Sequence, residues 1–291
     1  MKSDKYIIYS ISNSPFQEWQ ADLLDYSFEK VKQPGRLIRL CSEDGKYPKR
    51  KTPLSKAGLT ICTPDFSKFT SKIQWPVMNK AGSLQYLFKK YIFHDEDTLI
   101  FLDPDMIFIK IWDPEVKMGC AFGQKWKGYS PNYCQKTSVQ PELCPANDDE
   151  CLMYPFAIKA GDMKNLVEDI EYFARKGYLK CNDWMADMSA FVTAMVKGKI
   201  RMETKENIGL CNNWNNNDDE AAPIMHYCRP IKDRSGKIIW GKWRYQPWKL
   251  PPDLSQTTNK VDREVLRMLQ KFILSKKQGP ATHNTSFNKM V

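Results

Sequence analysis

The chain has 291 residues, 42% of them hydrophobic and 12% aromatic, and it carries a formal net charge of +10. This composition supports a full buried core and excludes an intrinsically disordered chain. No apolar run approaches the roughly 20 residues that span a bilayer, and the apolar stretch at the N-terminus is too short for a secretory signal. We therefore expect a soluble, cytoplasmic protein whose basic charge favours anionic ligands such as nucleotide sugars or nucleic acid.

The nine cysteines occur singly along the sequence, and no C-x-x-C pair is present. This spacing argues against a structural zinc site. An odd, dispersed set of cysteines in a chain without a signal sequence is typical of reduced thiols. Cys134, Cys144 and Cys151 are close enough in the sequence to suggest a cluster, although three unconnected small side chains are the simpler explanation.

The N-terminal segment reads as a strand over residues 5–11, a turn over 12–15 and a helix over 16–31. Ser14 or Asn13 is placed to cap that helix. Strand–loop–helix openings of this kind commonly hold part of a nucleotide, which makes Ser12 and Asn13 candidates to contact one. The glycine fingerprint of a dinucleotide fold is absent, and this counts against a dehydrogenase.

Strands and helices continue to alternate, which predicts the α/β class. Short strands are expected at 37–41 and 59–63, followed by a helix over 76–93. Asn79 and Lys80 lie near the start of that helix and are candidates to face a ligand. Ordinary surface polarity is the alternative explanation for both residues.

The most informative stretch is an apolar run, residues 99–102, that leads into Asp103-Pro104-Asp105. The run predicts a strand buried on both faces, as in a parallel sheet. Pro104 offers no N–H to a sheet, so regular pairing is expected to stop there. Positions i and i+2 of an extended chain point the same way, so the two carboxylates can converge on one cation. A turn between two apolar strands is the alternative.

Beyond this stretch we expect a strand over 119–124, a long functional loop over 125–149, a strand over 151–159 and a helix over 162–176. A further helix is expected over 182–196. It carries Asp183 and Asp187 four residues apart, on one face. Asp183 can equally be a helix-capping residue. Asp187 is flanked by apolar residues and is expected to face a polar site, because burying an unpaired carboxylate is costly.

The C-terminal part contains a short strand, residues 224–227, in which His226 reads as a hydrogen-bonded core residue rather than a ligand. Lys242 and Arg244 follow in an aromatic, basic segment and are candidates to hold phosphate; a solvated strand edge is the alternative. We expect one domain over residues 1–255, an amphipathic helix within 256–275 packed on it, and a flexible tail over 276–291.

Several of these pieces, taken in order, resemble one family. The sequence is similar to the plant and algal peptidyl hydroxyproline arabinosyltransferases and their serine galactosyltransferase relatives. The resemblance extends over most of residues 5–255. The matching stretches are 14–20, 79–80, 102–108, 183–187, 225–227 and 241–244.

The resemblance implies an A-type glycosyltransferase fold, with a mostly parallel central sheet flanked by helices and a C-terminal helix. It implies a UDP-sugar donor and a metal, Mn²⁺ or Mg²⁺, held by the DxD motif residues Asp103 and Asp105 with His226. Asp187 would contact the donor sugar or the incoming hydroxyl, with retention of configuration, and Asp183 is the second catalytic candidate. The donor-binding candidates are Ser12, Asn13, Asn79, Lys80, Asp103, Lys242 and Arg244.

Two departures from the family bear on the acceptor. The relatives are anchored in the secretory pathway, whereas this sequence shows neither a signal nor an anchor, and its charge is basic. A hydroxyl on a polypeptide or glycan is the first expectation. A virus- or phage-encoded enzyme acting in the cytoplasm on hydroxymethylated pyrimidines in DNA is the second, with loop 125–149 lining the groove. A non-catalytic nucleic-acid binder using Trp240 and Trp243 would explain the charge but not the acidic stretch.

Overall fold

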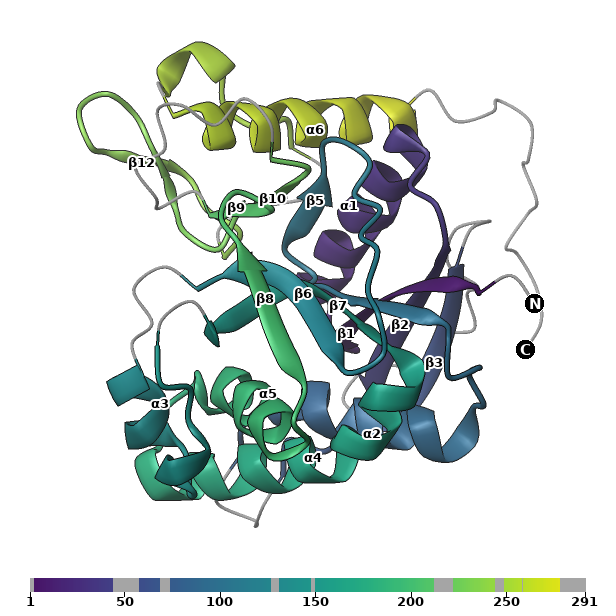
Figure 1. Ribbon diagram of the computed structural model, residues 1–291. Helices are drawn as coiled ribbons and strands as arrows, with labels where there is room; N and C mark the ends of the chain where they lie inside the picture. Colours follow the sequence, from purple (N-terminus) through teal and green to yellow (C-terminus); the bar gives the residue numbers. More distant parts are fainter. Residues whose placement is uncertain are drawn as a thin grey trace, which may run out of the picture.

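The computed structural model describes residues 3–43, 58–68, 74–126, 131–147, 150–211, 222–243, 249–257 and 259–277. Within these ranges the chain forms three layers, with helices on both faces of a seven-stranded sheet (Figure 1). The strands lie in the order β3-β2-β1-β4-β7-β6-β8. Their bounds are β1 (Lys5–Ser12), β2 (Arg36–Glu43), β3 (Gly58–Pro64), β4 (Thr98–Phe101), β6 (Cys120–Lys125), β7 (Leu152–Lys159) and β8 (Arg201–Lys205).

The sheet is mostly parallel, as the sequence predicts. Strand β1 pairs in parallel with β2 and β4, and β2 pairs in parallel with β3. Strand β7 runs against both of its neighbours, β4 and β6, while β8 is parallel to β6. Ile7 of β1 lies opposite Ile100 of β4, and both side chains are fully buried. Burial on both faces explains why the central strands are continuously apolar.

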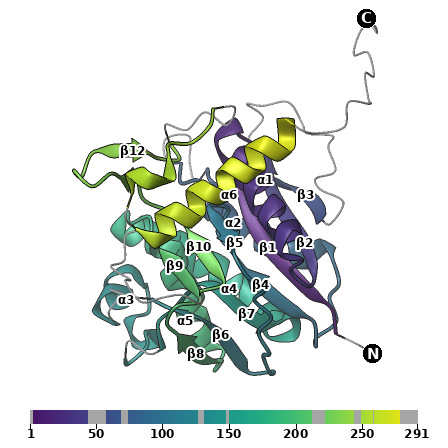
Figure 2. The ribbon, with the colours of Figure 1, turned by 90° about the horizontal axis from the view of Figure 1, so that it is seen from above.

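Helices α2 (Met78–Lys90), α4 (Ala160–Cys181) and α5 (Ala186–Lys197) lie on one face of the sheet, and α1 (Pro15–Val31) and α6 (Lys260–Lys277) lie on the other (Figure 1). Figure 2 shows α6 crossing over α1. Helix α1 is capped by Ser14, whose side chain accepts a hydrogen bond from the Gln17 N–H at 3.4 Å. Pro15 occupies the first helical position, where its missing N–H has no cost. Of the two predicted caps, Ser14 is therefore the one used.

A second, three-stranded sheet lies beside the first, in the order β5-β10-β9 (Figure 1). Its strands are β5 (Met106–Phe108), β9 (Gly209–Cys211) and β10 (Ile224–His226), and a hairpin of β11 (Ile231–Lys232) and β12 (Ile238–Trp240) follows it. The buried side chains of Trp19, Tyr227 and Trp240 pack together between α1, this sheet and the hairpin. A separate apolar cluster thus holds the C-terminal segments, including α6, onto α1.

The structure corrects part of the predicted loop over 125–149. Its described residues include a short helix, α3 (Pro131–Thr137), and a turn of 3₁₀-helix, η1 (Pro141–Leu143). Each begins with a proline. Proline fixes the backbone angle that a first helical residue needs. The prolines that suggested irregular chain are therefore the residues that start these two helices.

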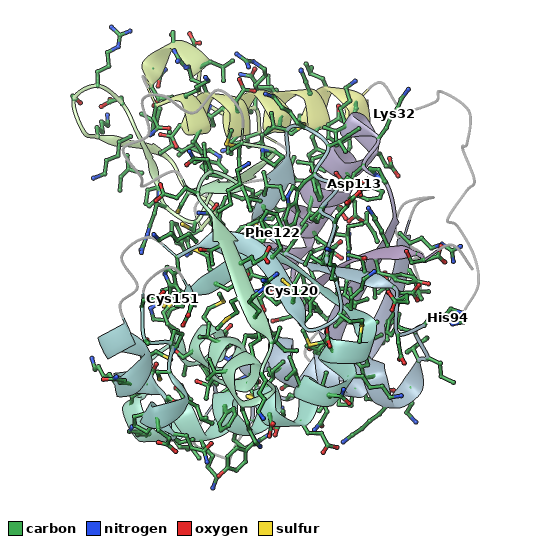
Figure 3. All side chains as sticks on the ribbon, viewed as in Figure 1. Lys32, His94, Asp113, Cys120, Phe122 and Cys151 are labelled. Atoms are coloured by element: carbon green, nitrogen blue, oxygen red, sulfur yellow. The ribbon has the colours of Figure 1, made fainter. Side chains whose placement is uncertain are left out.

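Element boundaries differ from the predictions in the charged regions. Strand β8 was not predicted. Its sequence, Arg-Met-Glu-Thr-Lys, is mostly charged or polar because the strand lies at an edge of the sheet, so it lacks the apolar run that marks the central strands. Helix α6 runs to Lys277, two residues past the predicted end of the C-terminal helix, and residues 278–291 lie outside the described ranges. On β6, the side chain of Cys120 is buried and that of Phe122 is half-buried, whereas Lys32 and His94 are exposed and lie at the margin of the molecule in Figure 3. None of the helices in the described ranges has the length together with the apolar composition that a membrane-spanning helix needs.

Candidate metal and nucleotide-sugar site

The acidic stretch occupies the turn between β4 and β5. Strand β4 ends at Phe101, and the backbone N–H of Met106 donates to the Asp103 carbonyl at 3.1 Å before β5 begins. Pro104 lies in this break, as predicted. The turn and the ligand-site interpretations are therefore compatible, because the turn itself presents Asp103 and Asp105 at the carboxyl end of β4. Ligands of open α/β sheets bind at that edge.

His226 is brought to Asp105 by strand pairing. Strand β10 runs antiparallel to β5, with His226 opposite Met106, the residue after Asp105. The Nε2 atom of His226 lies 3.2 Å from Oδ1 of Asp105. The ammonium group of Lys242 donates to the other oxygen, Oδ2. Each of three residues, Asp103, Asp105 and His226, offers one ligand atom, and these atoms lie within 4.8 Å of one another. The three side chains could therefore hold a metal ion.

The charges in this group depend on one another. Burial alone would raise the pKa of Asp105, but the positive charges of His226 and Lys242 outweigh it and hold that pKa well below its usual range. Burial would lower the pKa of His226, but Asp105 outweighs this and raises it to about 9. Asp105 is therefore a carboxylate, and His226 is an imidazolium at neutral pH. Two cations face the two oxygens of one buried acid.

Lys80 connects the acidic turn to α5. Its Nζ atom lies 2.5 Å from Oδ1 of Asp103 and 3.3 Å from Oδ2 of Asp187. The same atom lies 4.9 Å from the ring centroid of Tyr154, a cation–π contact. Burial would lower the pKa of Lys80, but Asp103 and Asp187 outweigh it and raise that pKa well above its usual value. Lys80 therefore stays charged between two carboxylates from separate elements.

Asp187 lies in the first turn of α5 and is 1% exposed. Burial raises its pKa, an effect that Lys80 opposes. The sequence predicted that this carboxylate would face a polar partner, and the structure gives it one. The expectation that Asp183 shares a helix face with it is wrong, because α5 begins at Ala186. Oδ1 of Asp183 instead accepts a hydrogen bond from the Met185 N–H at 2.9 Å, in the turn before the helix.

The other donor-binding candidates are placed differently. The amide of Asn79 is used inside the protein: its oxygen accepts from the Phe66 N–H at 2.7 Å, and its nitrogen donates to Oδ1 of Asp65 at 3.3 Å. Ser12 and Asn13 lie at the carboxyl end of β1, lining a depression beside Arg39 and Thr60. This is the same sheet edge as the acidic turn, because β1 and β4 are parallel. Arg244 lies outside the described residues.

Sequence reasoning missed two features of the site. Tyr154 carries the ring beneath Lys80, but within the apolar strand β7 it gave no signal beyond that of a core residue. Cys211 and Cys228 lie next to His226 and form a second group, with that histidine, of possible metal ligands. Their separation in the sequence hid this proximity, which the pairing of β9 with β10 creates.

No protein-family model matches the chain. The chain is distantly homologous to the peptidyl serine alpha-galactosyltransferase of Arabidopsis thaliana, with 23% identity over 253 residues, covering 78% of this chain and 30% of the relative. The resemblance seen in the sequence motifs is thereby confirmed.

A solved structure shares the fold. The WbbM bifunctional glycosyltransferase, in its apo form, matches with a TM-score of 0.53 at 10% identity, over 95% of this chain and 52% of that one. The predicted fold class, a mostly parallel α/β sheet with a C-terminal helix and a glycosyltransferase as structural neighbour, is confirmed. The chain spans about a third of the curated relative and about half of this structural neighbour.

Proposed function

We propose that the chain is a metal-dependent glycosyltransferase that moves a sugar such as galactose or arabinose from a UDP-sugar to a hydroxyl group. The observation that carries the proposal is the convergence of Asp103, Asp105 and His226 within 4.8 Å. It occurs at the carboxyl edge of the sheet, in a chain that shares its fold with a glycosyltransferase. A bare turn between two strands would not require a histidine from a distant segment.

The side chains present fit a divalent ion. Two carboxylates and a neutral imidazole are ligands that Mn²⁺ accepts, so His226 would lose its proton on binding the ion; carboxylates with water suit Mg²⁺. In the structure, the imidazolium of His226 and the ammonium of Lys242 face the two oxygens of Asp105, where positive charge is therefore already favoured. When bound by Asp103, Asp105 and His226, the ion would neutralise the diphosphate of the donor.

The basic residues around the site supply further positive charge. We propose that Lys80 and Lys242, with Arg244, contact the diphosphate, whose negative charge grows as the sugar leaves. Lys80 carries its charge at the centre of the site, between Asp103 and Asp187. Ser12 and Asn13 would contact the nucleoside from the depression at the end of β1.

Asp187 is the proposed catalytic residue nearest the sugar. Its carboxylate, held by Lys80 at 3.3 Å, would orient the donor sugar or the incoming hydroxyl. The relative's name describes alpha-galactosyl transfer to peptidyl serine. Because UDP-galactose is itself an α-glycoside, transfer of that kind retains configuration. With UDP-galactose as the donor, we expect proton magnetic resonance to show an α-linked product; a β-linked product from that donor would make Asp187 a general base instead.

The primary test needs no knowledge of the acceptor. Calorimetry of the purified chain with UDP, with and without Mn²⁺, should show binding that strengthens when the ion is present. Slow hydrolysis of a UDP-sugar should stop with a chelator and resume with Mn²⁺. Full hydrolysis in the chelator would contradict the metal proposal. Failure of UDP to bind under either condition would contradict the glycosyltransferase proposal and favour a non-catalytic nucleic-acid binder.

A further inference from the structure

Two cysteines flank His226. Cys211 is the last residue of β9, which pairs in parallel with β10 so that Cys211 lies opposite His226. Cys228 follows His226 by two residues. Side chains two apart on extended chain point to one side, and so do register partners on neighbouring strands. The topology thus brings both thiols to the same side as the histidine, although the sequence keeps them apart.

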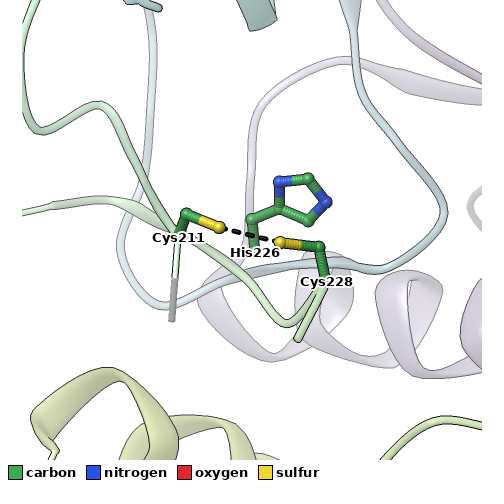
Figure 4. A group of neighbouring side chains, drawn as sticks. All are labelled: Cys211, His226 and Cys228. Atoms are coloured by element: carbon green, nitrogen blue, oxygen red, sulfur yellow. Dashed lines mark hydrogen bonds between the residues drawn. The ribbon is translucent and has the colours of Figure 1, made fainter. Parts of the chain in front are cut away.

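The two sulfur atoms are in contact. Sγ of Cys211 lies 2.8 Å from Sγ of Cys228. Figure 4 shows the two sulfurs turned toward each other with the imidazole of His226 beside them, and a ring nitrogen and both sulfurs lie within 4.8 Å of one another. Cys211 is 5% exposed, and Cys228 is half-buried. Packing around the two side chains therefore keeps the sulfurs close together. Cys228 is the more exposed thiol, so an oxidant in solution reaches it first.

The separation of the two sulfurs favours a disulfide-forming pair over a zinc site. Two thiolates on one tetrahedral zinc ion lie about 3.8 Å apart, given a zinc–sulfur bond of about 2.3 Å. A disulfide bond is about 2.05 Å long. The observed 2.8 Å is closer to the bond than to the zinc arrangement. In addition, the Nε2 atom of His226 faces Asp105 at 3.2 Å, in the other group of candidate ligands.

We propose that Cys211 and Cys228 are a modification site: they form a disulfide in the presence of a disulfide oxidant such as oxidised glutathione. The Cys228 thiolate attacks one glutathione sulfur and releases glutathione as a thiol. The Cys211 thiolate then attacks Cys228 in the mixed disulfide and releases the second glutathione. The two cysteines lose two protons and two electrons, and the oxidant takes up both. The bond ties β9 to the chain that follows β10.

This inference does not rest on the proposed function, and its test uses no sugar. The purified chain is incubated with oxidised glutathione or with dithiothreitol, its thiols are alkylated, and its peptides are mapped without reduction. We expect a peptide joining Cys211 to Cys228 after oxidation only. We also expect a melting temperature about 5 °C higher in the oxidised chain, as closure of a loop of this size predicts.

Two outcomes would overturn the proposal. The first is alkylation of both cysteines after oxidation in the folded chain. The second is one tightly held zinc ion per chain, measured in the purified protein, that protects both thiols from alkylation. Cys211→Ser and Cys228→Ser should each abolish the melting shift equally. Cys181→Ser is the matched control: it removes a half-buried thiol that donates to the Gly177 carbonyl at 3.0 Å, and it should keep the shift. Mapping of the unaltered chain decides the question even where a variant fails to fold.

Discussion

The Nε2 atom of His226 lies 3.2 Å from Oδ1 of Asp105, although the two residues are far apart in the sequence. Antiparallel pairing of β5 with β10 makes this contact, with His226 opposite Met106. The Tyr227 N–H donates to the Asp105 carbonyl at 3.1 Å and fixes the same register in the backbone. A slip of one residue would turn the histidine to the other face of the sheet. The candidate metal site is therefore specified by strand register.

Replacing Asp105 tests the metal ligands directly. We expect Asp105→Asn to weaken Mn²⁺ binding by at least about 100-fold and to remove donor hydrolysis, because the amide keeps the shape but loses the anionic oxygen. Calorimetric titration with Mn²⁺ measures the first effect, and release of UDP measures the second.

Asp169→Asn is the matched control for that substitution. It changes an acid on α4 that pairs with Lys197 at 2.7 Å, away from the acidic turn. Its Mn²⁺ affinity should equal that of the unaltered chain. Equal affinity in Asp105→Asn would remove this carboxylate from the metal site.

The charge of His226 makes the stability of the metal-free chain depend on pH. Asp105 raises the pKa of His226 to about 9 in the folded chain, above the value of about 6.5 in an unfolded chain. The folded state therefore holds the proton more tightly, and this stabilisation is complete below pH 6.5. It is lost as pH rises from 6.5 to about 9. We expect the free energy of unfolding to fall by up to about 3 kcal/mol across this window.

Urea unfolding in a chelator, at several pH values within the window, measures this loss. His226→Gln should flatten the profile because it removes the titrating group. His94→Gln is the control, since His94 lies exposed at the margin of the molecule (Figure 3), and it should leave the profile unchanged. A profile that stays as steep in His226→Gln would assign the pH dependence to another group.

Lys80 holds two acids together, so its removal should expose their repulsion. Lys80→Met leaves the buried Asp187 without its cation. Removing one partner of a fully buried pair costs about 3–5 kcal/mol. The Lys80 side chain is 24% exposed, which lowers the expected loss to about 2–3 kcal/mol.

A double-mutant cycle with Asp187→Asn isolates this pair. The double variant should be more stable than the sum of the two single losses predicts, by about 1–2 kcal/mol, because no uncompensated charge remains at Asp187. Lys197→Met, which breaks the more exposed pair with Asp169, should cost less than about 1 kcal/mol. Strictly additive losses for Lys80 and Asp187 would show that they are not coupled.

Local pattern was sufficient to predict the central strands and the break at the acidic turn, and it limited the cap of α1 to Ser14 or Asn13. Apolar runs and a proline break are properties of neighbouring residues, so the sequence displays them. Asp187 was also predictable, because a carboxylate among apolar residues needs a partner. The partner itself, Lys80, was one of the candidates near the start of α2.

The contacts that the sequence could not predict are those made by long-range strand pairing. The contact between His226 and Asp105 depends on β10 pairing with β5, and the contact between Cys211 and Cys228 depends on β9. The sequence predicted β10, as a strand over 224–227, but it did not predict β9, and strands of only a few residues carry no pattern that shows which strand they pair with. Residue roles, the cytoplasmic location and the domain limits stay predictions from the sequence.

The acceptor is the part of the proposal that the site leaves most open. The distant relative is named for transfer to peptidyl serine, which favours a hydroxyl group on a polypeptide. The net charge of +10 alternatively favours a nucleic acid carrying hydroxymethylated pyrimidines. Charge is the weaker argument, because a basic surface also draws in nucleotide sugars. We therefore expect the acceptor to be a hydroxyl group on a polypeptide or glycan.

A panel of acceptors tests this choice with the unaltered chain, Mn²⁺ and labelled UDP-galactose or UDP-arabinose. The acceptors are serine peptides, hydroxyproline peptides, oligosaccharides and hydroxymethylated DNA. Label should enter a peptide or an oligosaccharide with the unaltered chain and with Asp169→Asn, but Asp105→Asn should transfer none. Transfer to DNA alone, with affinity that falls steeply as salt is raised, would contradict this prediction and identify the basic charge as an acceptor-binding feature. Because salt screens a peptide contact much less than a polyphosphate backbone, the salt dependence distinguishes the two acceptors even where transfer is slow.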